Sequence, residues 1–121
     1  MMRTATIRIR KESRASFADL RKQFLDTWDS GQYKGEFLEF ESPSALFRTI
    51  TPKRWDLIEA LQSHGPMSIR ALARTLARDV KRVHEDIQAL IEVGLVEKNP
   101  EGKIFVPYEE IRADFVIHAA A

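Results

Sequence analysis

The sequence predicts an α+β fold, and three observations support this prediction. Residues 4–10 alternate apolar and polar side chains with a β-branched bias, which is the pattern of a half-buried strand. Between residues 51 and 93, apolar side chains recur at helical spacing in three stretches, each preceded by a capping residue. Beyond Gly94, strand-forming residues flank an Asn-Pro-Glu-Gly turn at positions 99–102. We therefore expect a front sheet, a group of helices and a hairpin, in that order.

The front segment is predicted to be a strand–helix–strand extension. In its first strand, Ile7 and Ile9 share one side and are expected to face inward. Ser16 is the expected N-cap of an amphipathic helix. The buried stripe of this helix is predicted to comprise Phe17, Leu20, Phe24, Leu25 and Trp28. Residues 36–41, Glu-Phe-Leu-Glu-Phe-Glu, are interpreted as the second strand.

Four further helix starts carry a residue whose side-chain oxygen suits an N-cap. These residues are Ser42, Thr51, Ser68 and Asp79. The first opens a helical turn over residues 43–47, and the second opens a helix that ends near residue 63, before Gly65. The helix that follows Asp79 ends at Gly94. Its inner stripe is predicted to comprise Val80, Val83, Ile87, Leu90 and Ile91.

Two capped helices joined by a tight turn and followed by a hairpin form the pattern of a winged helix-turn-helix, which binds double-stranded DNA. A helix reads bases in the major groove when one face packs on the protein and the other presents hydrogen-bonding groups. With the apolar stripe inward, the outward residues near the start of the last helix are Lys81, Arg82, His84, Glu85 and Gln88. They are predicted to read bases or to align the helix, and one sequence leaves open which cation contacts a base.

Arginines at spacings of four are predicted to hold the phosphate backbone. Arg70 and Arg74 share a helical face, and Arg78 lies in the turn that follows. The alternative is a solvated charged face, with ordinary surface pairs between Arg74 and Asp86 or between Arg78 and Asp79. Both interpretations stay open at the level of the sequence.

Three more residues complete the predicted DNA-binding set. The free N–H groups near Ser68 are candidates to cradle a phosphate, as helix N-termini do. Lys98 and Lys103 lie close to the tip of the hairpin and are predicted to contact a neighbouring phosphate.

Composition excludes several classes of function. The chain of 121 residues fits one domain, and the absence of cysteine excludes disulfides, thiolate nucleophiles and zinc fingers. Its three histidines are scattered, so we expect no metal and no cofactor. It has no phosphate-binding glycine loop and no nucleophile elbow, so no enzyme is predicted. No apolar run reaches the roughly 20 residues of a membrane span, and a cytoplasmic protein without a membrane partner is expected.

Charge is segregated along the chain although the net charge is only +1. The first fifteen residues carry five cations against one anion, and residues 70–88 carry five against three. Acidic residues gather at Glu36, Glu39 and Glu41 and again over residues 109–114. Two basic and two acidic regions suit two different partners.

The second half of the chain resembles small prokaryotic MarR-like winged-helix regulators. The resemblance rests on Thr51-Pro-Lys-Arg-Trp, on residues 65–74, 79–86 and 90–97, and on Val106-Pro-Tyr-Glu-Glu-Ile-Arg. More narrowly, residues 51 to about 117 are similar to the TumA antitoxins encoded beside TumE toxins. This implies an autoregulating antitoxin with a cognate toxin as its partner. Those proteins tend to have glycine between the two helices, whereas this chain has Leu76-Ala77-Arg78. If Ala77 adopts a left-handed conformation there, it costs on the order of 1 kcal/mol, which the packing must offset.

The predicted division of the chain has three parts. Residues 1–50 form a dimerisation or partner-binding segment, and residues 51–107 form the winged helix-turn-helix DNA-binding domain. Residues 108–121 form a C-terminal tail, which we interpret as a helical turn followed by a strand.

Three roles are open for the front segment. Paired recognition helices about one DNA turn apart read palindromic half-sites, so a homodimer is expected. Its interface is predicted to comprise Phe17, Leu20, Phe24 and Trp28, with the Ile7–Ile9 strand pairing across it. Alternatively, the acidic strand at residues 36–41 covers a basic surface of a toxin, or the segment only completes the core of one chain.

The predicted function is that of a sequence-specific DNA-binding transcriptional regulator, a repressor that also serves as the antitoxin of a toxin–antitoxin pair. The alternative is a winged-helix module that neutralises or scaffolds a protein partner without binding DNA. The sequence does not identify an operator or a small-molecule effector.

Overall fold

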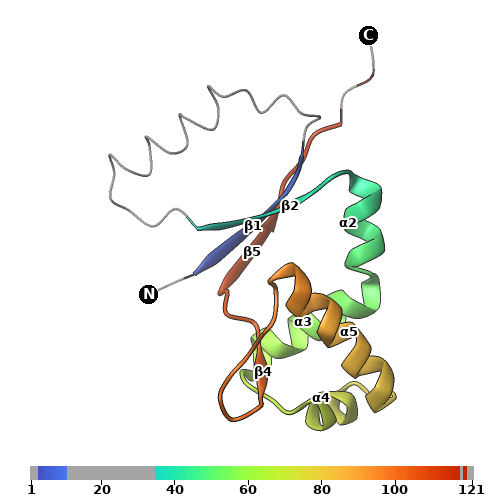
Figure 1. Ribbon diagram of the computed structural model, residues 1–121, viewed down its shortest axis with the longest axis vertical. Helices are drawn as coiled ribbons and strands as arrows, with labels where there is room; N and C mark the ends of the chain where they lie inside the picture. Colours follow the sequence, from blue (N-terminus) through green and yellow to red (C-terminus); the bar gives the residue numbers. More distant parts are fainter. Residues whose placement is uncertain (1–2, 11–34, 118, 120–121) are drawn as a thin grey trace.

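The computed structural model describes residues 3–10, 35–117 and 119, and over these residues the protein has the predicted α+β fold. In chain order the elements are β1 (Thr4–Ile9), β2 (Glu36–Phe40), α2 (Pro43–Thr49), α3 (Pro52–His64), α4 (Ile69–Thr75), α5 (Val80–Val93), β3 (Glu97–Lys98), β4 (Ile104–Phe105) and β5 (Glu110–Ala113). Figure 1 shows the sheet formed by β1, β2 and β5 at one end of the molecule and α4 at the other. We call the first part the parallel sheet, and α3, α4, α5 and the β3–β4 hairpin the helical unit.

The parallel sheet has the strand order β2–β1–β5, and β1 pairs in parallel with both neighbours. Ala5 and Ile7 are fully buried, and Ile9 packs against the same core, so the predicted inward side of β1 is confirmed. Because both edges of β1 are occupied, the prediction that the Ile7–Ile9 strand pairs across a dimer interface is wrong. The other predicted interface residues, Phe17, Leu20, Phe24 and Trp28, lie outside the described residues.

The tail contains the predicted strand but no helical turn within residues 108–117. The backbone N–H of Glu109 donates to the carbonyl of Arg3 at 2.9 Å, and the β5 ladder then runs along β1 as far as Ala113. Pairing with a strand about a hundred positions away in the chain overrides the local helical pattern of this segment. The first and last parts of the predicted division therefore share one sheet.

All four predicted N-caps in the described part of the chain are confirmed. Each side chain accepts a hydrogen bond from the backbone N–H three positions later, at 3.0–3.4 Å. The capping residues are Ser42, Thr51, Ser68 and Asp79. Gly94 ends α5 in the left-handed conformation, with φ of 90°, which a glycine adopts without strain. Because these signals are local, they could be found in the sequence.

The helical unit packs around one hydrophobic core that it shares with the sheet. The fully buried side chains of α3 and α5 are Leu57, Ile58, Leu61, Val83, Ile87 and Leu90. Val80 departs from the predicted inner stripe, since it is 43% exposed. It is the first residue of α5 and does not pack against the hydrophobic core.

The hairpin is shorter than predicted but has the expected turn. The Asn99 side chain accepts the backbone N–H groups of Glu101 and Lys103, and Gly102 has φ of 84°. Met67 and Ile104 exchange two backbone hydrogen bonds of 3.0 and 2.8 Å, which attach the hairpin to the segment before α4. No helix in the described residues is long and apolar enough to cross a membrane.

Candidate nucleic-acid interface

Helix α5 has two chemically different faces. Val83, Ile87 and Leu90 are fully buried against the core, as its periodicity predicts. The side chains predicted to face the nucleic acid, Lys81, Arg82, His84, Glu85 and Gln88, are all exposed. We call these five residues the exposed face of α5. Its hydrophobic underside fixes the helix in place, so donors and acceptors are presented on a rigid surface.

A second polar group on α5, Asp86, points into the protein. Its carboxylate accepts hydrogen bonds from Arg54 Nε at 3.0 Å and from Arg78 Nη2 at 2.7 Å. Burial raises the pKa of this carboxyl, but the two arginine hydrogen bonds outweigh burial and hold the pKa below its ordinary value. Arg54 comes from α3 and Arg78 from the turn before α5. We call these three residues the Asp86 cluster; it ties α5 to both segments.

The Asp86 cluster changes the interpretation of Arg78. Its side chain is only 18% exposed and is paired with Asp86, whose side chain is 17% exposed. The predicted surface pairs of Arg74 with Asp86 and of Arg78 with Asp79 are not formed within the described residues. Arg78 is therefore a poor candidate for a phosphate contact and a good one for holding α5.

Arg54 is a residue that the sequence analysis missed. Besides its pair with Asp86, its Nη1 donates to the backbone carbonyl of Thr49 at 2.6 Å, at the end of α2. It thus links α2, α3 and α5. No short-range spacing signals a contact between residues 32 positions apart, so only the folded chain reveals it.

The predicted residues of α4 are exposed at the surface. Arg70 and Arg74 both point to solvent, and no ion pair within the described ranges occupies either guanidinium. The Ser68 hydroxyl accepts a hydrogen bond from the backbone N–H of Ala71, so Ser68 is the N-cap of α4. Two unpaired arginines remain available beside the helix-to-helix turn.

The turn between α4 and α5 contains the strain anticipated for Ala77. Its φ is 52°, and among non-glycine residues in the described chain it alone has a positive φ. The backbone N–H of Arg78 donates to the carbonyl of Ala73 at 2.9 Å, which closes the end of α4. The left-handed conformation, which glycine adopts without strain, is thus adopted here by an alanine.

The hairpin lysines are also exposed. Lys98 is the last residue of β3, and Lys103 precedes β4, so both lie beside the hairpin turn. Figure 1 shows the hairpin reaching toward the same end of the molecule as α4. Both lysine side chains are therefore accessible to the phosphates of a nucleic acid that lies against α4.

Basic and acidic regions of the front segment face each other within the chain. Arg3 pairs with Glu36 at 2.7 Å, and Glu39 lies 3.7 Å from Arg8 and 3.6 Å from Arg10. This pairing follows from the parallel register of β1 and β2, which sets Arg8 directly beside Glu39. Much of the acidic charge predicted to cover a toxin is therefore neutralised by the neighbouring strand.

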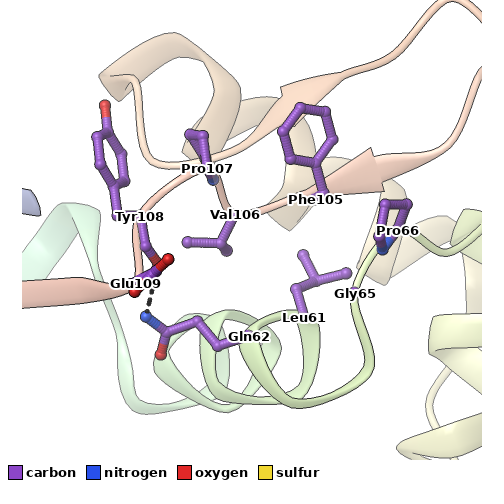
Figure 2. A pocket seen from close by; sticks show the side chains of 9 residues that line it. All are labelled: Leu61, Gln62, Gly65, Pro66, Phe105, Val106, Pro107, Tyr108 and Glu109. Atoms are coloured by element: carbon purple, nitrogen blue, oxygen red, sulfur yellow. Dashed lines mark hydrogen bonds between the residues drawn. The ribbon is translucent and has the colours of Figure 1, made fainter. Parts of the chain in front are cut away.

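Figure 2 shows a hollow of about 320 Å³ between the end of α3 and the segment that leaves β4. The Gln62 amide donates to the Tyr108 carbonyl at its wall, and Leu61 and Val106 line it with apolar groups. Over the described residues, no set of three or more His, Asp or Glu side chains is arranged to hold a metal ion.

Comparison with known proteins assigns a family. The HVO_A0114 family matches residues 49–113, which is more than half of the chain. This protein belongs to the HVO_A0114 family. The matched residues run from the end of α2 through the helical unit to the end of β5. Searches of curated proteins and of solved structures found no match.

Proposed function

We propose that this HVO_A0114 family member is a winged-helix protein that binds double-stranded DNA by sequence and represses transcription. Helix α5 enters the major groove, α4 lies against the backbone and the hairpin is the wing. The exposed face of α5 carries two cations, a carboxylate, an amide and an imidazole, which can all hydrogen-bond to base edges. Arg70, Arg74, Lys98 and Lys103 hold phosphates.

One observation carries this proposal: α5 is divided into a fully buried apolar face and a face of five exposed polar residues. Lys81, Arg82 and Gln88 lie on the exposed side of α5, where a helix that enters the major groove presents its hydrogen-bonding groups. The Asp86 cluster supports the same function because it fixes the depth and direction at which α5 is presented.

The test is a mobility-shift titration of the full chain on its own upstream region at several salt concentrations. Phosphate contacts make affinity fall steeply with salt, so a shift at low salt that weakens as salt rises is expected. No shift at low salt would remove the regulator function and leave the protein-interaction alternative.

Alanine variants separate the two kinds of contact. Changing Arg82 to alanine should weaken the specific site more than random DNA, whereas Arg70→Ala and Arg74→Ala should weaken both alike. Arg10→Ala is the matched control, because Arg10 directly follows β1 in the parallel sheet, away from the helical unit. Equal losses on specific and random DNA for all three variants would make Arg82 a phosphate contact only.

The antitoxin role and the MarR-like relationship remain predictions from the sequence. A small toxin gene beside this one, together with co-purification of its product with this chain, is the observation expected for that role. A chain that binds its operator without any such partner would keep the repressor proposal and remove the antitoxin role.

A further inference from the structure

Strand β5 is an edge of the parallel sheet. The strand order β2–β1–β5 gives it β1 as a neighbour on one side, and no described strand lies on the other. Three of its four residues, Glu110, Arg112 and Ala113, are exposed. An exposed edge presents unpaired N–H and C=O groups, which favour pairing with another strand.

Apolar side chains continue past the end of β5. Val116 is 63% exposed and Ile117 is 73% exposed, although both are large hydrophobic residues. On the side of the sheet that faces the helices, Ile111 and Phe115 are only partly buried at the margin of the core. The edge is therefore incomplete both in its hydrogen bonds and in its apolar packing.

We propose that β5 pairs antiparallel with β5 of a second copy of this chain, around a two-fold axis that passes beside Ala113. The two parallel sheets then join into one, with both β5 strands at its centre. In this register Arg112 lies opposite Asp114 of the second copy, and Ile111 lies opposite its Phe115. Each of these contacts occurs twice because the interface is self-complementary.

The charges select this register over its neighbours. With Arg112 on the axis, two arginines would face each other and Glu110 would oppose Asp114. With Asp114 on the axis, two aspartates would face each other. Like charges directly opposite destabilise an antiparallel pair, whereas opposite charges stabilise it. An axis at Ile111 would also place Arg112 opposite Glu110, but it would set Phe115 opposite Pro107 and Ile117 opposite Phe105 of β4, which already pairs within its own hairpin.

This dimer explains how the proposed DNA-binding protein would read a palindromic site, and in that respect the inference rests on the proposed function. A two-fold axis between antiparallel strands is perpendicular to the sheet, so both helical units lie on the same face of the joined sheet. Two α5 helices on one face meet the requirement for reading two half-sites of a palindrome. The homodimer expected from the sequence is thus assigned to β5 rather than to the β1 strand.

A cysteine placed on the axis tests the interface directly, because the natural chain has no cysteine. In an antiparallel pair, opposite Cα atoms lie about 4.5–5.5 Å apart, within the range that a disulfide spans. The full-length Ala113→Cys variant should cross-link rapidly to a dimer under mild oxidation without DNA. The matched control is Glu101→Cys, an exposed position at the hairpin turn, which should form only slow collisional products.

Mixed cysteine variants test the register. An equimolar mixture of Arg112→Cys and Asp114→Cys chains should form the cross-link between unlike chains, since each position lies opposite the other. Either variant alone should cross-link more slowly. Preferential cross-linking within each variant alone would overturn the proposed register.

Charge reversal provides a second measurement that does not depend on cysteine chemistry. Arg112→Asp and Asp114→Arg should each raise the dimer dissociation constant by about tenfold or more, because each converts two attractive pairs into repulsive ones. The double variant restores opposite charges across the axis and should recover most of the affinity. Sedimentation equilibrium measures all three, and circular dichroism checks that each remains folded.

Two outcomes overturn the proposal. The wild-type chain could be a monomer at high micromolar concentration, which would leave the β5 edge for a different protein. Alternatively, Ala113→Cys could cross-link no faster than Glu101→Cys in a chain that is dimeric, which would place the interface elsewhere. Neither outcome concerns DNA, whereas failure of the mobility shift with intact cross-linking would remove the DNA function and keep the dimer.

Discussion

The Asp86 cluster and the exposed face of α5 are two polar regions around one helix that differ in burial and in their partners. The charges of the first are paired within the protein, whereas the side chains of the second are exposed to solvent. Asp86 lies between Arg54 and Arg78 with its side chain only 17% exposed, whereas Glu85, the residue beside it, and Arg82, one turn earlier, are exposed to solvent. Removing one partner of a mostly buried ion pair destabilises a protein because it leaves the other charge uncompensated, whereas exposed cations contribute little to stability and are free to bind. Charge alone does not identify a DNA contact; its partner inside the protein must be known as well.

The largest effect on stability is expected from Asp86→Ala. Removing the carboxylate leaves Arg54 and Arg78 close to each other without a common partner. The free energy of unfolding should therefore fall by about 2 kcal/mol. Urea denaturation measures this, with Glu85→Ala as the matched control on the same helix. A loss below about 0.5 kcal/mol, equal to that of an ordinary surface position, would show that the cluster does not hold α5.

Acid should remove the same contribution progressively. Because the folded-state pKa of Asp86 is lowered, its stabilisation is complete above the unfolded-state value and is lost as pH falls through the folded value. The difference in unfolding free energy between wild type and Asp86→Asn should therefore shrink as pH falls below about 4. A difference that stays constant down to acid pH would mean that the carboxylate charge is not what stabilises the cluster.

A smaller effect, of opposite sign, is expected at the turn between α4 and α5. Ala77 is held at φ of 52°, where glycine has no penalty from a Cβ atom. Ala77→Gly should stabilise the protein by about 0.5 kcal/mol, since relief of strain is partly offset by the greater entropy of the unfolded glycine chain. Thermal denaturation measures this change in stability. A melting temperature lower than that of the wild type would show that the backbone at Ala77 is not strained.

The smallest effects on stability are expected on the exposed face of α5. Single alanine substitutions at Lys81, Arg82 and Gln88 should each change the unfolding free energy by less than about 0.5 kcal/mol. The same three variants should lose affinity for DNA. If they unfolded the protein as Asp86→Ala does, the division of α5 into a holding side and a binding side would be wrong.

Local features of the fold could be predicted from the sequence. The four N-caps, the glycine after α5 and the hairpin turn each depend on residues a few positions apart, and each is observed. The exposed face of α5 follows from the same short periodicity. These elements make up most of the helical unit.

Contacts between distant residues could not be predicted in this way. Arg54 meets Asp86 across the packing of two helices, and β5 pairs with β1 from the other end of the chain. The tail has apolar residues that suit either a strand or a helix, and only the available edge of β1 decides between them. The spacing of the arginines predicted a phosphate contact for Arg78, but it did not predict the hydrogen bond between Arg78 and Asp86.

DNA reading by α5 is tested most directly by an amide NMR titration of the full chain with a duplex from its own upstream region. The largest shifts are expected on α4, on the first half of α5 and at Lys98 and Lys103. Amides of β1 should change little on DNA addition. Shifts confined to the parallel sheet, with α5 unchanged, would contradict the claim that the exposed face of α5 reads DNA.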